Sequence, residues 1–92
     1  MVASHFEAEI LRRVLRPDDG DLPAEAAREL LKLGFTEQDH RRMEVLSTRS
    51  NEGTLTDVER EELDGYANVS HFIAFVHSKA RLSLKRHGTN AA

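Results

Sequence analysis

The residues with the clearest potential for chemistry lie in the stretch SNEGTLTDVEREEL, residues 50–63. With Gly53 at the sixth position of a helix-flanked calcium loop, Leu55 takes the apolar eighth position and Glu59 the twelfth, where a bidentate carboxylate would bind the ion. The other ligand positions fall on Thr48, Ser50, Glu52 and Thr56. The first position therefore lacks an aspartate, and two carboxylates are few to replace the water around a calcium ion.

The same residues fit a simpler interpretation, in which the stretch is the corner between two helices. Gly53 can end one helix in the left-handed conformation, because glycine has no Cβ to clash there. Thr56 with Glu59 three residues later is the pattern of a capping box that begins the next helix. We favour this interpretation, and a degenerate calcium-binding loop is the alternative.

Other catalytic or metal-binding patterns are missing from the sequence. There is no cysteine, no phosphate-binding glycine loop and no Gly-x-Ser-x-Gly elbow. His71 and His77 are six residues apart, which places them on different faces of a helix. Glu61 and Glu62 are more simply a solvated helix start than an acid–base pair. We therefore expect no enzyme activity, no metal and no cofactor.

Length and composition indicate a single helical domain over residues 1–92, with flexible tails at 1–3 and 88–92. The chain is 39% hydrophobic with a net charge of −3, which is typical of a folded protein and argues mildly against a dedicated nucleic-acid surface. The N-terminus mixes charges into every turn and no long apolar run follows, so we expect a cytoplasmic protein without a membrane segment.

Helix start and stop signals predict an all-α fold of four helices. The first opens with a capping box of Ser4 and Glu7 and closes before Pro17. The second runs from Pro23, at a first helical position, to Gly34 as a left-handed cap. The third starts at Thr36, where Asp39 replaces the usual glutamate of a capping box, and fades before Gly53. The fourth spans about 56–87.

A helix over 56–87 is too long for a compact chain of this size. At 1.5 Å per residue it would reach about 48 Å, whereas a compact domain of this length is about 32 Å across. It must therefore kink near Gly65 or project towards a partner. One broad stripe is expected to face the three short helices: Leu55, Val58, Tyr66, Val69, Ile73, Val76, Ala80 and Leu84.

A second apolar line on this helix is the candidate dimer or partner interface, formed by His71, Phe72, Phe75 and Leu82. Scattered exposed apolar residues are the alternative explanation. The helix is acidic at its start and basic at its end, and residues 65–77 carry no formal charge. Two copies packed antiparallel would place acidic starts beside basic ends, so we expect a homodimer that completes the helical bundle.

A basic patch at the end of the long helix supports an alternative function in nucleic-acid binding. The patch consists of Lys79, Arg81, Lys85 and Arg86. Basic residues at a helix C-terminus also complement the helix dipole, and we favour that explanation. The preferred prediction is a non-catalytic protein-interaction module.

Several phrases along residues 6–86 resemble a family of small, uncharacterised bacterial helical proteins. They are ILRRVLRPDDGDLPAEAARELLKLGF, RRMEVL and GTLTDVEREELDGYANVSHFIAFVHSKARLSLK. The residues that carry the resemblance are Gly53, Thr54, Leu55, Thr56, Glu59, Ser78, Lys79, Ala80 and Arg81. It implies a shared all-helical fold, and genes that neighbour those of relatives suggest an accessory or antitoxin-like protein partner. Leu22 before Pro23 departs from the family's small capping residue, which puts the start of the second helix in doubt.

Overall fold

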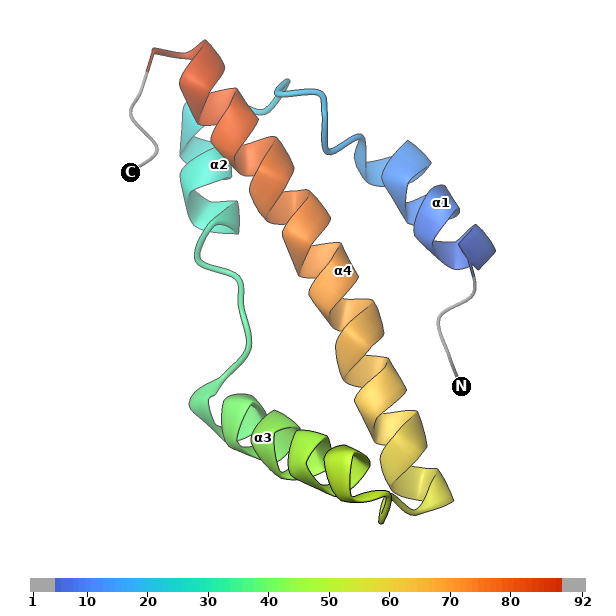
Figure 1. Cartoon of the computed structure of the whole chain (residues 1–92). Helices are drawn as coiled ribbons and strands as arrows, with labels where there is room; N and C mark the ends of the chain where they lie inside the picture. Colours follow the sequence, from blue (N-terminus) through green and yellow to red (C-terminus); the bar gives the residue numbers. More distant parts are fainter. Residues whose placement is uncertain (1–4, 89–92) are drawn as a thin grey trace.

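The computed structural model describes residues 5–88, which fold into four helices without strands (Figure 1). They are α1 (His5–Leu15), α2 (Ala24–Leu30), α3 (Glu37–Glu52) and α4 (Asp57–Arg86). The predicted all-α fold with a long last helix is confirmed. The predicted tails at 1–3 and 88–92 lie outside the described residues except for Gly88, and so does Ser4 of the first predicted cap.

The long helix α4 is continuous over its 30 residues, about 45 Å at 1.5 Å per residue. Its N-cap is Thr56, whose side chain accepts a hydrogen bond from the backbone of Glu59, while the Glu59 carboxylate accepts one from the backbone of Thr56. Its C-cap is His87. The predicted bounds and capping box are therefore confirmed, and Gly65 does not interrupt the helix.

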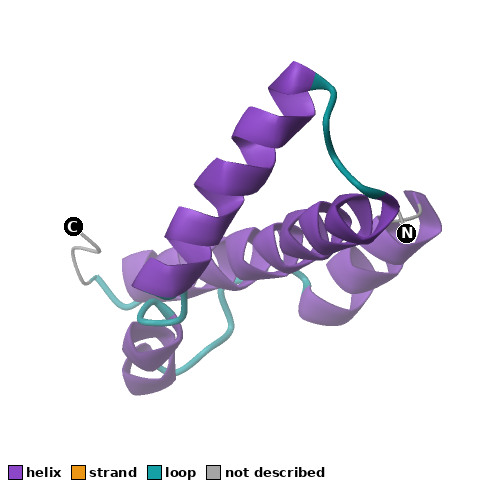
Figure 2. Ribbon diagram, turned by 90° about the horizontal axis from the view of Figure 1, so that it is seen from below, coloured by secondary structure: helices purple, strands orange, loops and turns teal. Residues whose placement is uncertain are grey.

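Each of the three short helices packs on α4, and within the described residues no short helix contacts another. In Figures 1 and 2 the short helices diverge along the length of α4 and do not form a parallel bundle. The chain is correspondingly elongated, with principal extents of 48, 29 and 16 Å. Its radius of gyration is 15.8 Å, against the ~12 Å expected for a compact chain of this length.

The junction after α1 holds the one non-glycine residue with a left-handed backbone among the described residues, Arg16 (φ 50°). Its backbone N–H donates to the carbonyl of Arg12 at 2.8 Å, which closes the last turn of α1. Pro17 follows and cannot continue a helix. The predicted end before Pro17 is confirmed, although the sequence did not reveal that an arginine would adopt the conformation that usually favours glycine.

Both predicted ends of the second helix need correction. Pro23 is the N-cap of α2 and lies one residue before the first helical position. The predicted left-handed cap at Gly34 is wrong, because α2 ends at Leu30 with a right-handed C-cap at Leu31. Backbone hydrogen bonds from Lys32 to Glu29 and from Leu33 to Leu30 tighten this end into a short turn, so no glycine is required.

The buried core is small and lies in two places. Ala27 of α2 packs with Ala80 and Leu84 of α4 in one cluster, and Leu46 of α3 is fully buried elsewhere. The expected core stripe on α4 is therefore only partly correct. Its C-terminal members are buried, whereas Val58 and Val69 are exposed because no short helix covers that side.

The loop between α1 and α2 is fastened to the C-terminal half of α4. Gly20 is buried against the backbone of Leu82 and Ser83, so closely that a Cβ at position 20 would lie 2.7 Å from the Leu82 carbonyl carbon. The Ser83 hydroxyl accepts a hydrogen bond from the Leu22 N–H at 3.1 Å. A residue without a side chain is thus required where the loop crosses α4.

Replacing Gly20 by alanine should destabilise the fold, because a Cβ would collide with backbone that cannot move aside locally. We expect a loss of about 2 kcal/mol in the free energy of unfolding, measured by urea denaturation. Gly34→Ala is the matched control, since a Cβ there meets no atom within 4 Å. Equal stability of the two variants would contradict the close approach.

Candidate functional site

The corner between α3 and α4 has the geometry of a helix end followed by a helix start. Gly53 is the C-cap of α3 in the left-handed conformation, with φ 71° and ψ 25°. Its N–H donates to the carbonyl of Ser50, and the N–H of Thr54 donates to Arg49. With the capping box of Thr56, these bonds confirm the corner interpretation of residues 50–63.

Glu59, the residue that would be the bidentate calcium ligand, is buried and already paired. Its Oε2 forms an ion pair with Arg49 and lies 3.7 Å from Arg42 Nη2. Two arginines therefore bring positive charge to the place where a calcium loop needs carboxylates. Among residues 5–88 no group of three histidine, aspartate or glutamate side chains could hold a metal ion.

Arg42 also pairs with a second carboxylate of α4. Arg42 donates two hydrogen bonds to Glu62, from Nε at 2.8 Å and from Nη2 at 2.9 Å. This bidentate pairing lowers the pKa of Glu62 and raises that of Arg42. The contact fixes the crossing of α3 on α4.

A third contact joins the start of α3 to the middle of α4. Tyr66 donates its hydroxyl to Asp39 Oδ1 at 2.9 Å, and the backbone and hydroxyl of Thr36 donate to Asp39 Oδ2. The hydrogen bonds from Thr36 and then from Tyr66 lower the pKa of Asp39, and the bond to Asp39 raises the pKa of Tyr66. The sequence predicted Asp39 as a capping residue but gave no sign of its bond to Tyr66.

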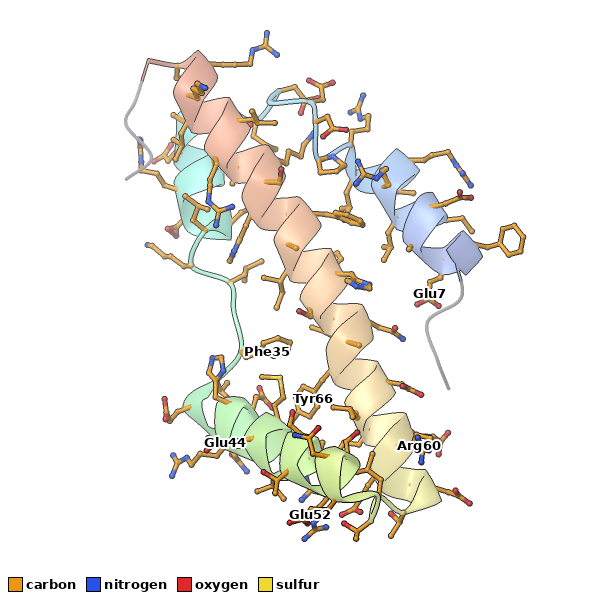
Figure 3. All side chains as sticks on the ribbon, in the orientation of Figure 1. Glu7, Phe35, Glu44, Glu52, Arg60 and Tyr66 are labelled. Atoms are coloured by element: carbon orange, nitrogen blue, oxygen red, sulfur yellow. The ribbon has the colours of Figure 1, made fainter. Side chains whose placement is uncertain are left out.

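Phe35 packs against this contact from the connection between α2 and α3. Its ring meets the Tyr66 ring edge-on, with centroids 5.7 Å apart (Figure 3). It also meets the His40 ring, with centroids 6.1 Å apart. The whole corner is thus a structural joint whose polar groups are satisfied by one another.

Two of the four residues of the predicted basic patch pair with the acidic loop, which we define as residues 18–21. Lys79 Nζ lies 2.5 Å from Asp21 Oδ1 and donates to the backbone carbonyl of Asp19 at 3.0 Å. This contact lowers the pKa of Asp21. Arg86 lies 3.8 Å from Asp19. Arg81 and Lys85 are exposed and form no ion pair within residues 5–88.

These contacts also give structural roles to residues that carried the family resemblance. The Ser78 hydroxyl donates to the carbonyl of Pro17 at 3.3 Å. Lys79 anchors the acidic loop, and Ala80 is fully buried against α2. The segment 78–83 is therefore the surface on which the loop and α2 dock.

The structure separates the predicted interface residues into covered and open ones. Phe75 lies under α1, with the Arg12 guanidinium 5.2 Å from its ring centroid, and Leu82 is half-buried beside Gly20. His71 and Phe72 are exposed. A neighbour from the same chain therefore covers Phe75, which the sequence had placed in the candidate dimer or partner interface.

An open apolar face remains beside α1, and we define it by Ile10, Val14, Val69 and Phe72. Their exposed fractions are 49%, 69%, 47% and 39%. Val14 and Phe72 line one shallow recess together with Val76 and Leu30. Val14 of α1 and Phe72 of α4 thus meet at one recess, which Asp21 of the acidic loop and Lys79 also border. Helical spacing had placed Val69 in the core stripe, and its exposure corrects that prediction.

No family model, curated protein or solved structure matches the chain. The resemblance to small bacterial helical proteins therefore stays a prediction. None of the described helices is long and apolar enough to cross a bilayer. The geometry of the chain itself must therefore indicate its function.

Acid should destabilise the fold, because hydrogen bonds lower the pKa values of Asp21, Asp39 and Glu62. A carboxylate with a lowered pKa stabilises the folded state above its unfolded pKa, and this contribution is lost as the pH falls through the folded pKa. We expect the melting temperature to drop as the pH falls below about 5. Glu62→Gln should show a smaller drop than the wild type.

The control for this variant is Glu44→Gln on the exposed side of α3 (Figure 3). It should retain the acid sensitivity of the wild type. If Glu62→Gln loses as much stability in acid as Glu44→Gln, the bidentate contact with Arg42 does not stabilise the fold.

Proposed function

We propose that this chain is a non-catalytic protein-interaction module that forms a homodimer through the α4 part of the open apolar face, Val69 and Phe72. The observation that carries the proposal is the exposure of Val69 and Phe72 on α4, together with exposed Val14 of α1, which lines one recess with Phe72. Lone exposed apolar residues are common, but a contiguous apolar face is typical of an interaction site.

The small core gives a physical reason for assembly. Ala27, Leu46, Val76, Ala80 and Leu84 are the buried hydrophobic residues of the described chain. Short chains bury a modest share of their surface and often add stability by association. Complete burial of one exposed Phe or Val side chain is worth about 1–2 kcal/mol, so a face of four such side chains can support a weak dimer.

The proposed interface stays on α4, as predicted, but its residues differ from the predicted ones. Phe72 becomes the central residue and His71 borders it. Phe75 contacts α1, and the backbone of Leu82 contacts Gly20 of the acidic loop. A different protein partner, such as the accessory partner implied by the resemblance, would use the same face. The oligomeric state of the purified chain separates these two cases.

Nucleic-acid binding is less well supported than self-association. Lys79 and Arg86 already pair with the acidic loop. Arg12 of α1 pairs with Asp18 of the same loop, and Arg16 pairs with both Asp19 and Asp21. A phosphate backbone would have to compete with these carboxylates. The net charge of −3 adds no general attraction.

Phe72→Asp should weaken the dimer at least about tenfold, because it places a charge at the centre of the apolar contact in both copies. Sedimentation equilibrium over a concentration series measures the change. Ser70→Asp is the matched control, since Ser70 is exposed on the side of α4 opposite Phe72 and should leave the dissociation constant unchanged. A wild type that stays monomeric up to millimolar concentration would refute the proposal.

A further inference from the structure

We propose that α1 forms half of the homodimer interface, so that the α1–α4 pair of one chain packs antiparallel on the α1–α4 pair of a second copy. This inference rests on the proposed function and adds the second helix and the orientation. In the resulting arrangement α4 faces the α4 of the other copy and α1 faces the other α1.

Helix α1 presents two separate faces. Its inner face contacts α4 through Ala8 and Arg12, which lie beside His71 and Phe75. Ile10 and Val14, four residues apart, form a line on a different face. A helix that already packs through one side and still exposes a line of branched apolar residues is typical of a helix with a second neighbour.

The exposed faces of α1 and α4 belong to one surface. Val14 and Phe72 line the same recess, so each helix contributes one exposed apolar side chain to it. The chain is also thin, at 16 Å in its smallest dimension. A thin two-helix layer with one apolar side is half of a four-helix arrangement, which a second copy can complete.

Charge selects the orientation of the second copy. Both helices carry acidic residues early and basic residues late: α1 has Glu7 in its first turn and the exposed Arg13 in its last, whereas Arg12 pairs with Asp18. In α4, the exposed Asp57 lies in the first turn and the exposed Lys85 in the last, whereas Glu59 and Arg86 pair within the chain. The two helices run in roughly the same direction along the molecule (Figure 1). An antiparallel copy therefore sets acidic starts against basic ends in both layers.

The neutral centre of the layer coincides with its exposed apolar residues. Residues 65–77 of α4 carry no formal charge, and Val69 and Phe72 lie within them. A two-fold axis through this centre brings apolar side chains of both copies together and sends the charges to the rim. Arg13, which forms no ion pair within residues 5–88, then lies near the acidic start of the α1 in the second copy.

The size of the face sets the expected affinity. A face two helices wide and about eleven residues long covers on the order of 350 Å² at 1.5 Å per residue and about 10 Å per helix. A typical stable interface buries about 800 Å² per partner. We therefore expect a weak dimer that forms with increasing concentration.

Single-cysteine variants test the inference directly, because the chain has no native cysteine. Ile10→Cys and Val69→Cys should each form a disulfide-linked dimer under mild oxidation, since both positions lie close to the two-fold axis. Ser70→Cys, exposed on the side of α4 opposite Phe72, is the control and should stay largely monomeric. Non-reducing gel electrophoresis and mass spectrometry measure the yields.

The outcomes separate the two proposals. Cross-linking of Val69→Cys without Ile10→Cys would overturn the role of α1 and leave the α4 homodimer standing. Failure of both variants, together with a monomeric wild type in sedimentation, would overturn both proposals. Cross-linking of Ser70→Cys at the same yield as Ile10→Cys would show random collision and would also overturn the inference.

Charge reversal tests the orientation. Arg13→Glu should weaken the dimer about threefold to tenfold, because it turns a rim attraction into repulsion in each of two symmetric contacts. The double variant Glu7→Arg, Arg13→Glu should recover most of the affinity, because it restores opposite charges between the two copies. In a parallel dimer Arg13 would face Arg13 of the second copy, so Arg13→Glu would replace one like-charge pair by another. An unchanged dissociation constant would therefore contradict the antiparallel arrangement.

Discussion

The structure depends on one helix that is longer than a chain of this size can surround. α4 spans 30 residues, and every tertiary contact between described helices includes it. Because α1, α2 and α3 each pack on α4 and not on one another, no closed core can form around it. The buried apolar residues of α4 are Val76, Ala80 and Leu84, while Val58 and Val69 of its apolar stripe are exposed.

Polar contacts fix the position of α3 and of the connection from α1 to α2 on α4. Arg42 with Glu62 and Tyr66 with Asp39 fix α3, while Lys79 with the acidic loop fixes the connection from α1 to α2. Exposed ion pairs contribute little individually, so these contacts serve mainly to set geometry. The apolar face beside α1 has no such partner in residues 5–88, and this difference makes it the natural place for association.

The sequence predicted the features that depend on neighbours close in the chain. Capping boxes at Thr36 and Thr56 and the left-handed Gly53 need only three or four residues, and all three are confirmed. Helical spacing also identified the apolar faces of α4. It could not identify which face each short helix covers, since that choice depends on loop path. Hence the sequence placed Val69 in the core and Phe75 in an open interface, whereas Val69 is exposed and α1 covers Phe75.

Hydrogen exchange of the α1 amides at two protein concentrations distinguishes a helix with one neighbour from a helix with two. A helix that contacts only α4 within one chain should open more easily than the segment of α4 around Ala80 and Leu84. If α1 also packs against a second copy, its protection should rise with concentration while that of α2 stays constant. Protection of α1 that equals that of the α4 core and does not change with concentration would contradict assembly through α1.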